Sequence, residues 1–129
     1  MYLVDTSVLI DFIKGTETVQ SKKLEMILQE QIPFAISAFT YQEVLQGAKN
    51  EKEYDRLNDY LSTQKIIYPS KESYEQAAKL FFTCRKSGIT IRSTIDLLIA
   101  ITAIENNFIL LHSDRDFDNM LGVCELRVE

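Results

Sequence analysis

Glycine and proline are scarce in this chain of 129 residues, which contains four glycines and two prolines. Their scarcity excludes a collagen-like or low-complexity sequence. The chain also lacks a glycine-rich segment of the kind that wraps around phosphate groups, so a nucleoside triphosphatase is not expected. With 46% hydrophobic and 26% charged residues, the composition is that of a folded globular protein. The length predicts one domain spanning residues 1–129.

Cysteines and long hydrophobic runs are limited as well. Cys84 and Cys124 lie far apart and neither belongs to a CxxC pair, so no zinc knuckle or thioredoxin-type site is expected. The most apolar run, Ile95–Ile104, is interrupted by Asp96 and is too short for a membrane span of roughly 20 residues. No basic, signal-like segment precedes Asp5. Two reduced thiols in a chain without such segments favour a soluble, cytoplasmic protein.

Positive charge is in deficit. The 14 lysine and arginine residues are outnumbered by 19 aspartate and glutamate residues, which gives a net charge of −5. Proteins that coat nucleic acid through their general surface are basic. If this chain acts on nucleic acid, it must do so locally, through a metal ion or a small group of cations.

Short apolar runs alternate with segments of helical periodicity. The expected strands cover residues 2–4, 34–36, 66–67, 108–111 and 124–128. The expected helices cover residues 8–14, 24–31, 38–48, 51–63, 73–86 and 94–105. This alternation predicts an α/β fold, a three-layer α/β/α sandwich with a short-stranded, mainly parallel central sheet. Ligands of such sheets bind beyond the carboxyl ends of the strands.

Acidic residues stand where those strands end or where the next helix begins. Asp5 directly follows the first strand, and Asp114 and Asp116 follow the strand at 108–111; a helix N-cap is the ordinary alternative for each. Asp96 differs, because it opens a helix that is otherwise apolar on every side. A helix N-terminus favours an anion by roughly 0.3–1 kcal/mol, which is less than the several kcal/mol that an unpaired buried charge costs. Asp96 therefore needs a cation or several hydrogen-bond donors.

Glu43 is a fifth candidate, on the helix face that also carries Phe39 and Gly47. Acids held close together repel and raise one another's pKa unless a cation joins them. Mg²⁺, or Mn²⁺ in its place, prefers oxygen ligands and can activate water and stabilise the leaving oxygen of a phosphodiester. Such an ion also reverses the local charge that an acidic protein presents to a polyanion.

Four segments, in order, resemble the motifs of PIN-domain ribonucleases. They are LVDTSVLI at 3–10, SAFTYQEVLQG at 37–47, STIDLLIA at 93–100 and LHSDRDF at 111–117. Within this family the chain resembles the VapC-type toxins of bacterial toxin–antitoxin pairs. The resemblance implies a PIN-like fold and a metal-dependent endoribonuclease that hydrolyses RNA phosphodiester bonds. It also implies a homodimer and a cognate VapB-like antitoxin, whose tail occupies a groove beside the acids.

The resemblance implies a role for each acid. Asp5 and Asp96 are expected to be the main Mg²⁺ ligands. Glu43 is expected to bind the metal or its waters, and Asp114 to complete the acidic set. Asp116 matches an acid present in many members, and either assists Asp114 or substitutes for it. The sequence leaves the division of roles between these two open.

Four further residues lie in or beside the motifs. By the same resemblance, Thr6 is expected to orient a ligand or contact the substrate. Arg92 and Arg115 are candidates for contacting RNA phosphates, with ordinary solvated charges as the alternative. His112, the only histidine, ends a strand and is expected to be packed rather than to act as a general base.

Two other functions suit an acidic α/β domain. One is a non-catalytic PIN-fold module that binds RNA or protein, but the filled acidic positions favour the nuclease. The other is a phosphotransfer receiver or an aspartyl phosphatase. The phosphatase motif has an acid two residues after its first aspartate, where Ser7 stands here. A receiver carries its phosphorylated aspartate at the end of a middle strand, where none is predicted.

Overall fold

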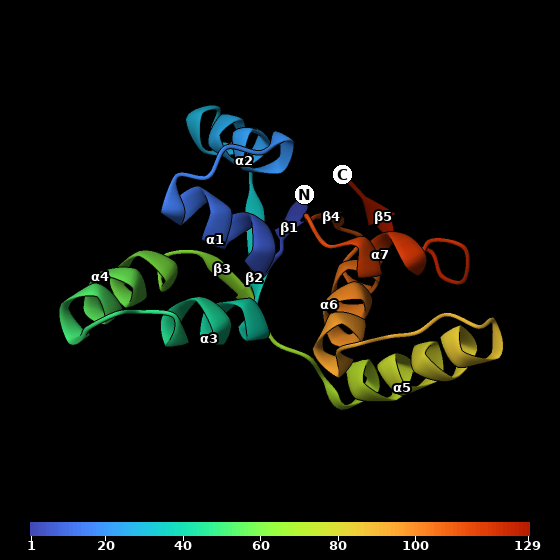
Figure 1. Cartoon of the computed structure of the whole chain (residues 1–129). Helices are drawn as coiled ribbons and strands as arrows, with labels where there is room; N and C mark the ends of the chain where they lie inside the picture. The colour runs from blue at the N-terminus through green and yellow to red at the C-terminus, as the bar shows by residue number, and fades with distance from the viewer.

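The computed structural model describes all 129 residues, in which helices cover both faces of a central sheet (Figure 1). The strands are β1 (Tyr2–Val4), β2 (Phe34–Ser37), β3 (Lys65–Ile67), β4 (Ile109–Leu111) and β5 (Arg127–Val128). The helices are α1 (Thr6–Lys14), α2 (Val19–Gln29), α3 (Ala38–Gln46), α4 (Glu51–Leu61), α5 (Lys71–Lys86), α6 (Thr94–Glu105) and α7 (Arg115–Asn119). The strand order is β3-β2-β1-β4-β5, and every neighbouring pair is parallel.

The alternation of side chains along the central strands builds two hydrophobic cores. Leu3 of β1 packs with Leu110 of β4 in the core beneath α5, α6 and α7. The next residue of each strand, Val4 and Leu111, packs in the other core beneath α1 to α4. Successive residues of a strand point to opposite faces of a sheet, so both faces of this sheet are buried. The predicted three-layer sandwich is confirmed, with α1–α4 on one side and α5–α7 on the other (Figure 1).

Helix α6 is the buried centre of its layer. Its bounds are the predicted ones, and all residues from Leu97 to Ala103 are buried. Asp96 stands one position before this buried stretch, at the edge of the sheet where the helix begins. No helix of this fold combines the length and the hydrophobicity that crossing a bilayer requires.

The C-terminal strand is shorter than the sequence predicts. Only Arg127 and Val128 pair with β4. Cys124 instead lies in the turn after α7, where its Sγ donates to the carbonyl of Met120 at 3.3 Å. The prediction of a strand over 124–128 was therefore wrong in its first three residues. Hydrophobicity alone does not show where the pairing of an edge strand begins.

The strand order of the sheet changes side between β1 and β4. The chain adds β2 and β3 on one side of β1, and then places β4 and β5 on the other side. Ligand sites of open parallel sheets form at such a switch point, beyond the carboxyl ends of the two strands. Asp5 directly follows β1, and Asp114 comes shortly after β4.

Candidate functional site

Asp5 is held at the end of β1 by the residues that start α1. It is 5% exposed and caps the helix, with its Oδ2 accepting from Ser7 N at 3.1 Å and from Ser7 Oγ at 2.6 Å. The Ser7 hydroxyl also accepts from Ser113 N at 3.1 Å, which ties the end of β1 to the segment after β4. Burial raises the pKa of Asp5, although the hydrogen bonds from Ser7 oppose that shift.

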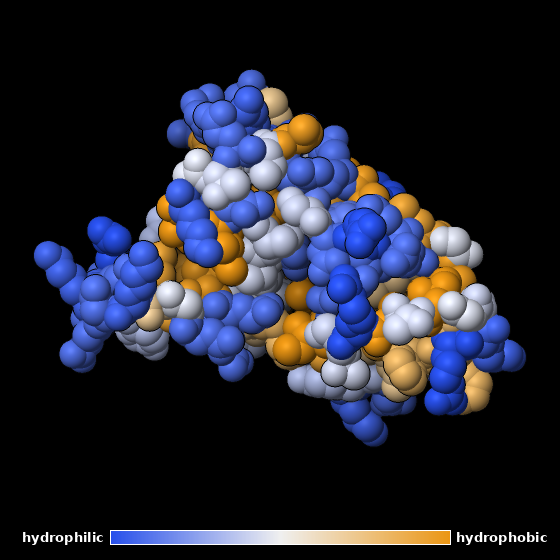
Figure 2. All heavy atoms as spheres, in the orientation of Figure 1, coloured by the Kyte–Doolittle hydropathy of each residue, from blue (hydrophilic) through white to orange (hydrophobic).

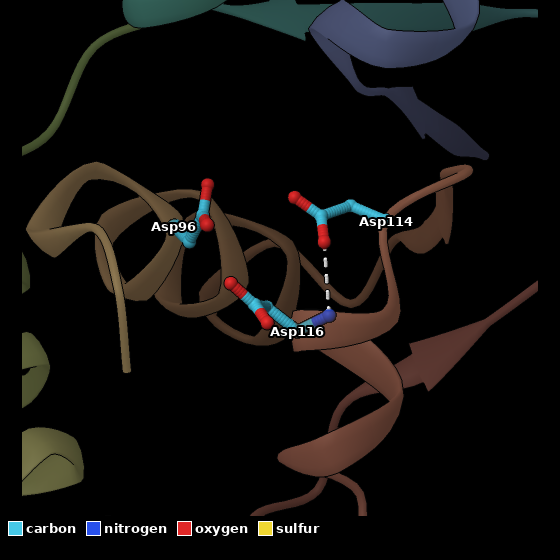
Figure 3. A group of neighbouring side chains, drawn as sticks. All are labelled: Asp96, Asp114 and Asp116. Atoms are coloured by element: carbon cyan, nitrogen blue, oxygen red, sulfur yellow. Dashed lines mark hydrogen bonds between the residues drawn. The ribbon is translucent and has the colours of Figure 1, made fainter. Parts of the chain in front are cut away.

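Asp114 caps α7 at the end of the neighbouring segment. Its Oδ1 accepts from Asp116 N at 3.0 Å, while its own N–H donates to Nδ1 of His112 at 3.1 Å. A side chain with both its backbone and its carboxylate engaged has a fixed direction. Figure 3 shows that direction: the Asp114 carboxylate faces Asp96.

His112 supports this loop and is packed, as predicted. Its side chain is 6% exposed, and its ring lies 5.1 Å from the ring of Phe117. Nε2 lies 3.2 Å from Asp118 Oδ1, and Nδ1 is occupied by the N–H of Asp114. Because both ring nitrogens have partners, His112 has no free nitrogen with which to act as a general base.

Asp96 from α6 completes a group of three carboxylates with Asp114 and Asp116. One oxygen from each residue lies within 4.8 Å of the other two. In Figure 3 the three side chains converge from the start of α6, the loop before α7 and α7 itself. Asp96 precedes Asp114 and Asp116 by more than 15 positions in the sequence, and the three meet at one edge of the sheet.

The carboxylate of Asp96 is in an unfavourable electrostatic position. Its pKa is raised from 3.8 to about 7, first by burial and then by repulsion from neighbouring acids. Those acids are Asp114, Asp5, Asp116 and Glu43, in decreasing order of effect. The other four acids predicted from the sequence thus all act on Asp96, although Asp5 and Glu43 stand outside the group of three.

Asp116 is the most enclosed of the three carboxylates and pairs with an arginine. It is 6% exposed, and its two oxygens accept from Nε and Nη2 of Arg92, each at 3.0 Å. Arg92 Nη2 also lies 3.8 Å from Asp114 Oδ1. Hydrogen bonding to Asp116 raises the pKa of the Arg92 guanidinium, so Arg92 stays charged. Arg92 was a candidate for contacting RNA phosphates, with a solvated charge as the alternative; its head group is paired with Asp116, and an RNA contact stays a prediction.

Glu43 accepts a hydrogen bond from the hydroxyl of Thr6, the first residue of α1. Thr6 Oγ1 lies 2.9 Å from Glu43 Oε1 and 3.0 Å from Thr40 Oγ1. Ser37 caps α3 by accepting from Thr40 N at 3.1 Å, and its hydroxyl lies 3.2 Å from Thr40 Oγ1. Thr6 therefore orients the candidate ligand Glu43, one of the two roles considered for it.

Arg115 is exposed and lines a small polar hollow with Gln20, Ser113 and Glu129. No hydrogen bond or ion pair joins it to any of the five acids.

Sequence reasoning did not find the link that Ser7 makes between Asp5 and Ser113. A local signal was available only for its contact with Asp5, since a residue two positions after an Asp cap is an expected donor to that cap.

The donor atoms suit one class of cation. The converging side chains offer carboxylate oxygens only, with no cysteine and with the one histidine turned to other partners. Hard divalent ions such as Mg²⁺ and Mn²⁺ take such ligands, whereas zinc sites usually include nitrogen or sulfur. The residues present therefore fit a hard divalent ion. Its positive charge would offset the repulsion between Asp96 and the neighbouring carboxylates.

Two apolar hollows flank the acids. The first, of about 330 Å³, lies between α1, α3 and α4, and we call it the α1–α4 groove. Its apolar lining comprises Ile10, Ile13, Val44 and Leu57. Its basic lining comprises Lys14, Lys49 and Arg56. The second, of about 380 Å³, runs between α5 and the start of α6.

Comparison with known proteins finds likeness along the whole chain. The family model for the PIN domain matches residues 2–122, a span that contains all five acids. Ribonuclease VapC1 of Methanocaldococcus jannaschii is 35% identical over 106 residues, which cover 82% of this chain and 70% of that protein.

Solved structures share the fold at lower identity. A chain in VapBC2 from Rickettsia felis, bound to a DNA fragment from their promoter, has a TM-score of 0.78 and 23% identity. That match covers 99% of this chain and 96% of the other. A chain in a toxin-antitoxin complex from Klebsiella pneumoniae has a TM-score of 0.72 and 26% identity, covering 98% and 95%.

Proposed function

This chain belongs to the PIN domain family, and on that premise we propose that it is a metal-dependent endoribonuclease and the toxin of a toxin–antitoxin pair. The observation that carries the proposal is the convergence of acids from separate segments: Asp96, Asp114 and Asp116 each place an oxygen within 4.8 Å of the other two, and Asp5 and Glu43 are near enough to repel the charge of Asp96. The similarity to a ribonuclease VapC1 supports RNA as the substrate. The free state of Cys84 and Cys124 suits action in the cytoplasm.

Asp5, Glu43, Asp96 and Asp114 are the residues that we assign to hold Mg²⁺ or Mn²⁺. A divalent ion at this site supplies a Lewis acid that activates water and stabilises the leaving oxygen of an RNA phosphodiester. Thr6 keeps Glu43 oriented through the 2.9 Å contact with its Oε1. Arg115, whose head group has no acidic partner, is the freer of the two candidate arginines to contact RNA phosphates.

The test is a cleavage assay with the purified full-length chain. We expect RNA to be cut in the presence of Mg²⁺ or Mn²⁺, to remain intact when excess chelator is added, and to be cut again when the metal is restored. Sequencing of the new RNA ends identifies the cleavage site. An intact RNA pool together with no detectable Mn²⁺ binding would overturn the nuclease assignment and leave a non-catalytic RNA- or protein-binding module.

We assign the α1–α4 groove to a VapB-like antitoxin. The groove begins beside Glu43, since Val44 and Gly47 line it, so a bound segment can extend from it toward the acids. Its apolar lining, with three basic side chains against the one acidic side chain of Glu53, suits an amphipathic segment that carries acidic residues. The likeness to a chain from a Klebsiella pneumoniae toxin-antitoxin complex supports such a partner.

A homodimer is the assembly that we propose for the chain, with the exposed apolar face of α5 as the contact. Tyr74, Phe81 and Phe82 are 53%, 38% and 58% exposed on this helix, and Figure 2 shows apolar atoms at the surface over α5. We expect Phe81→Glu to convert a dimer into monomers, because the charge would be buried in the contact. Light scattering after gel filtration measures the mass. A wild-type protein that is monomeric at all concentrations would contradict this assembly.

A further inference from the structure

The pair formed by Arg92 and Asp116 is not explained by a simple list of metal ligands. Arg92 belongs to the irregular segment between α5 and α6, and Asp116 is the second residue of α7, 24 positions later. Nε and Nη2 of the guanidinium each reach a different oxygen of the carboxylate at 3.0 Å. This fork geometry fixes the relative orientation of the two planar groups, which a lysine could not do.

Both oxygens of Asp116 are therefore engaged before any ion binds. The carboxylate is 6% exposed, whereas the side chain of Arg92 is 68% exposed. A buried carboxylate that loses its only cationic partner is strongly unfavourable, so the pair holds the start of α7 against the segment before α6. Asp114 caps α7, and Asp96 lies in the first turn of α6, directly after the segment that carries Arg92.

Both members of the pair also contact Asp114. Asp116 N donates to Asp114 Oδ1, and Arg92 Nη2 lies 3.8 Å from the same oxygen. Both of these contacts are made by Oδ1, and the other oxygen of Asp114 faces Asp96 (Figure 3).

We propose that Arg92 and Asp116 form a positioning pair that holds Asp114 opposite Asp96 for metal binding, with Asp116 itself outside the set of direct ligands. This inference rests on the proposed function, because it concerns the metal that the nuclease needs. It assigns different roles to the two acids after β4: Asp114 binds the ion, and Asp116 orients Asp114. It also gives Arg92 a role within the site instead of at the RNA.

The experiment is a double-mutant cycle read by Mn²⁺ binding. Calorimetry with Mn²⁺ alone at pH 8 compares the wild-type chain with Arg92→Ala, Asp116→Ala and the double variant. Partners that orient metal ligands typically change affinity by about 10–100-fold. We expect each single variant to weaken Mn²⁺ binding about tenfold, and the double variant to weaken it by about the same factor rather than by the product. Arg92→Lys, which keeps the charge but not the fork, should recover only part of the affinity.

The matched control is Arg127→Ala, which removes an exposed arginine that also makes two hydrogen bonds, to Asn107, away from the acids. It should bind Mn²⁺ as the wild type does. If the alanine variants do not fold, Arg92→Lys and Asp116→Asn complete the same cycle with smaller changes.

Three results would overturn the positioning role while leaving the nuclease intact. The first is unchanged or tighter Mn²⁺ binding by Arg92→Ala, which would make Arg92 a mere competitor of the ion. The second is a loss in the double variant equal to the product of the single losses. The third is a lower melting temperature of the alanine variants with unchanged Mn²⁺ affinity, which would indicate that the pair has a purely structural role. Absence of Mn²⁺ binding by the wild-type chain would overturn the proposed function, and the positioning role with it.

Discussion

Replacing Asp96 with Asn is expected to reduce metal-dependent RNA cleavage about a thousandfold while the chain stays folded. Metal-assisted stabilisation of the transition state is worth several kcal/mol, and each 1.4 kcal/mol corresponds to a factor of about ten in rate. Asp96 is the acid whose pKa responds to all four of the others, so it lies where their fields overlap. Removing its charge takes away the carboxylate that a cation at this position would contact most favourably.

The same substitution should stabilise the metal-free protein at neutral and higher pH. The folded-state pKa of Asp96 is raised from 3.8 to about 7, so the folded chain holds this proton more tightly than the unfolded chain. The contribution of Asp96 to the free energy of unfolding is therefore greatest below pH 4, and it falls as the pH rises to 7. Asn carries no charge, so in the presence of chelator Asp96→Asn should gain about 2 kcal/mol at pH 8, after allowance for solvent screening of a part-exposed group, and almost nothing at pH 4.

Two measurements check these outcomes together. Initial cleavage rates with Mg²⁺ or Mn²⁺ give the loss of activity, and thermal unfolding in chelator at pH 4 and pH 8 gives the change in stability. Asp59→Asn, at an exposed position of α4, is the matched control and should change neither. A cleavage rate for Asp96→Asn equal to that of the wild type would remove Asp96 from the site. A loss of stability at pH 8 would show that the Asp96 carboxylate is a net stabilising group.

Much of this site could be predicted because its main signals are local. Asp96 stands out in the sequence, since it is an acid at the start of an otherwise apolar helix. Asp5 and Asp114 follow strands, and a parallel sheet brings the carboxyl ends of its strands to one edge. The alternation of strands and helices was enough to predict the three layers, because both faces of every central strand are apolar.

The parts that sequence reasoning missed depend on tertiary distance. Arg92 and Asp116 are 24 residues apart, and the charge of Arg92 is equally consistent with binding RNA or with solvent. Ser7 connects Asp5 with the backbone of Ser113 across 106 residues, which no local pattern indicates. The start of β5 was missed for a related reason, since edge pairing depends on which backbone groups β4 leaves available.

Lowering the pH is expected to weaken metal binding, with the change centred on Asp96. A carboxylate must lose its proton to bind a cation, so affinity follows the ionised fraction of the ligand. With the pKa of Asp96 at about 7, Mn²⁺ affinity should be nearly constant above pH 8. It should fall about tenfold for each pH unit below 7, or about a hundredfold between pH 8 and pH 5. The pKa of Asp5, which burial also raises, adds to the fall at the acidic end.

Proton release distinguishes this cause from a general loss of structure. Calorimetry in buffers of different ionisation enthalpy counts the protons displaced by each Mn²⁺ ion. That number should rise from near zero at pH 8 toward one at pH 6 and below, because the ion then competes with the proton on Asp96. The far-ultraviolet spectrum should stay constant over the same range, since protonation of Asp96 stabilises the fold relative to the ionised form. Mn²⁺ affinity that does not vary between pH 5 and pH 8 would contradict Asp96 as a ligand, because an acid with a pKa near 7 cannot bind a metal without this competition.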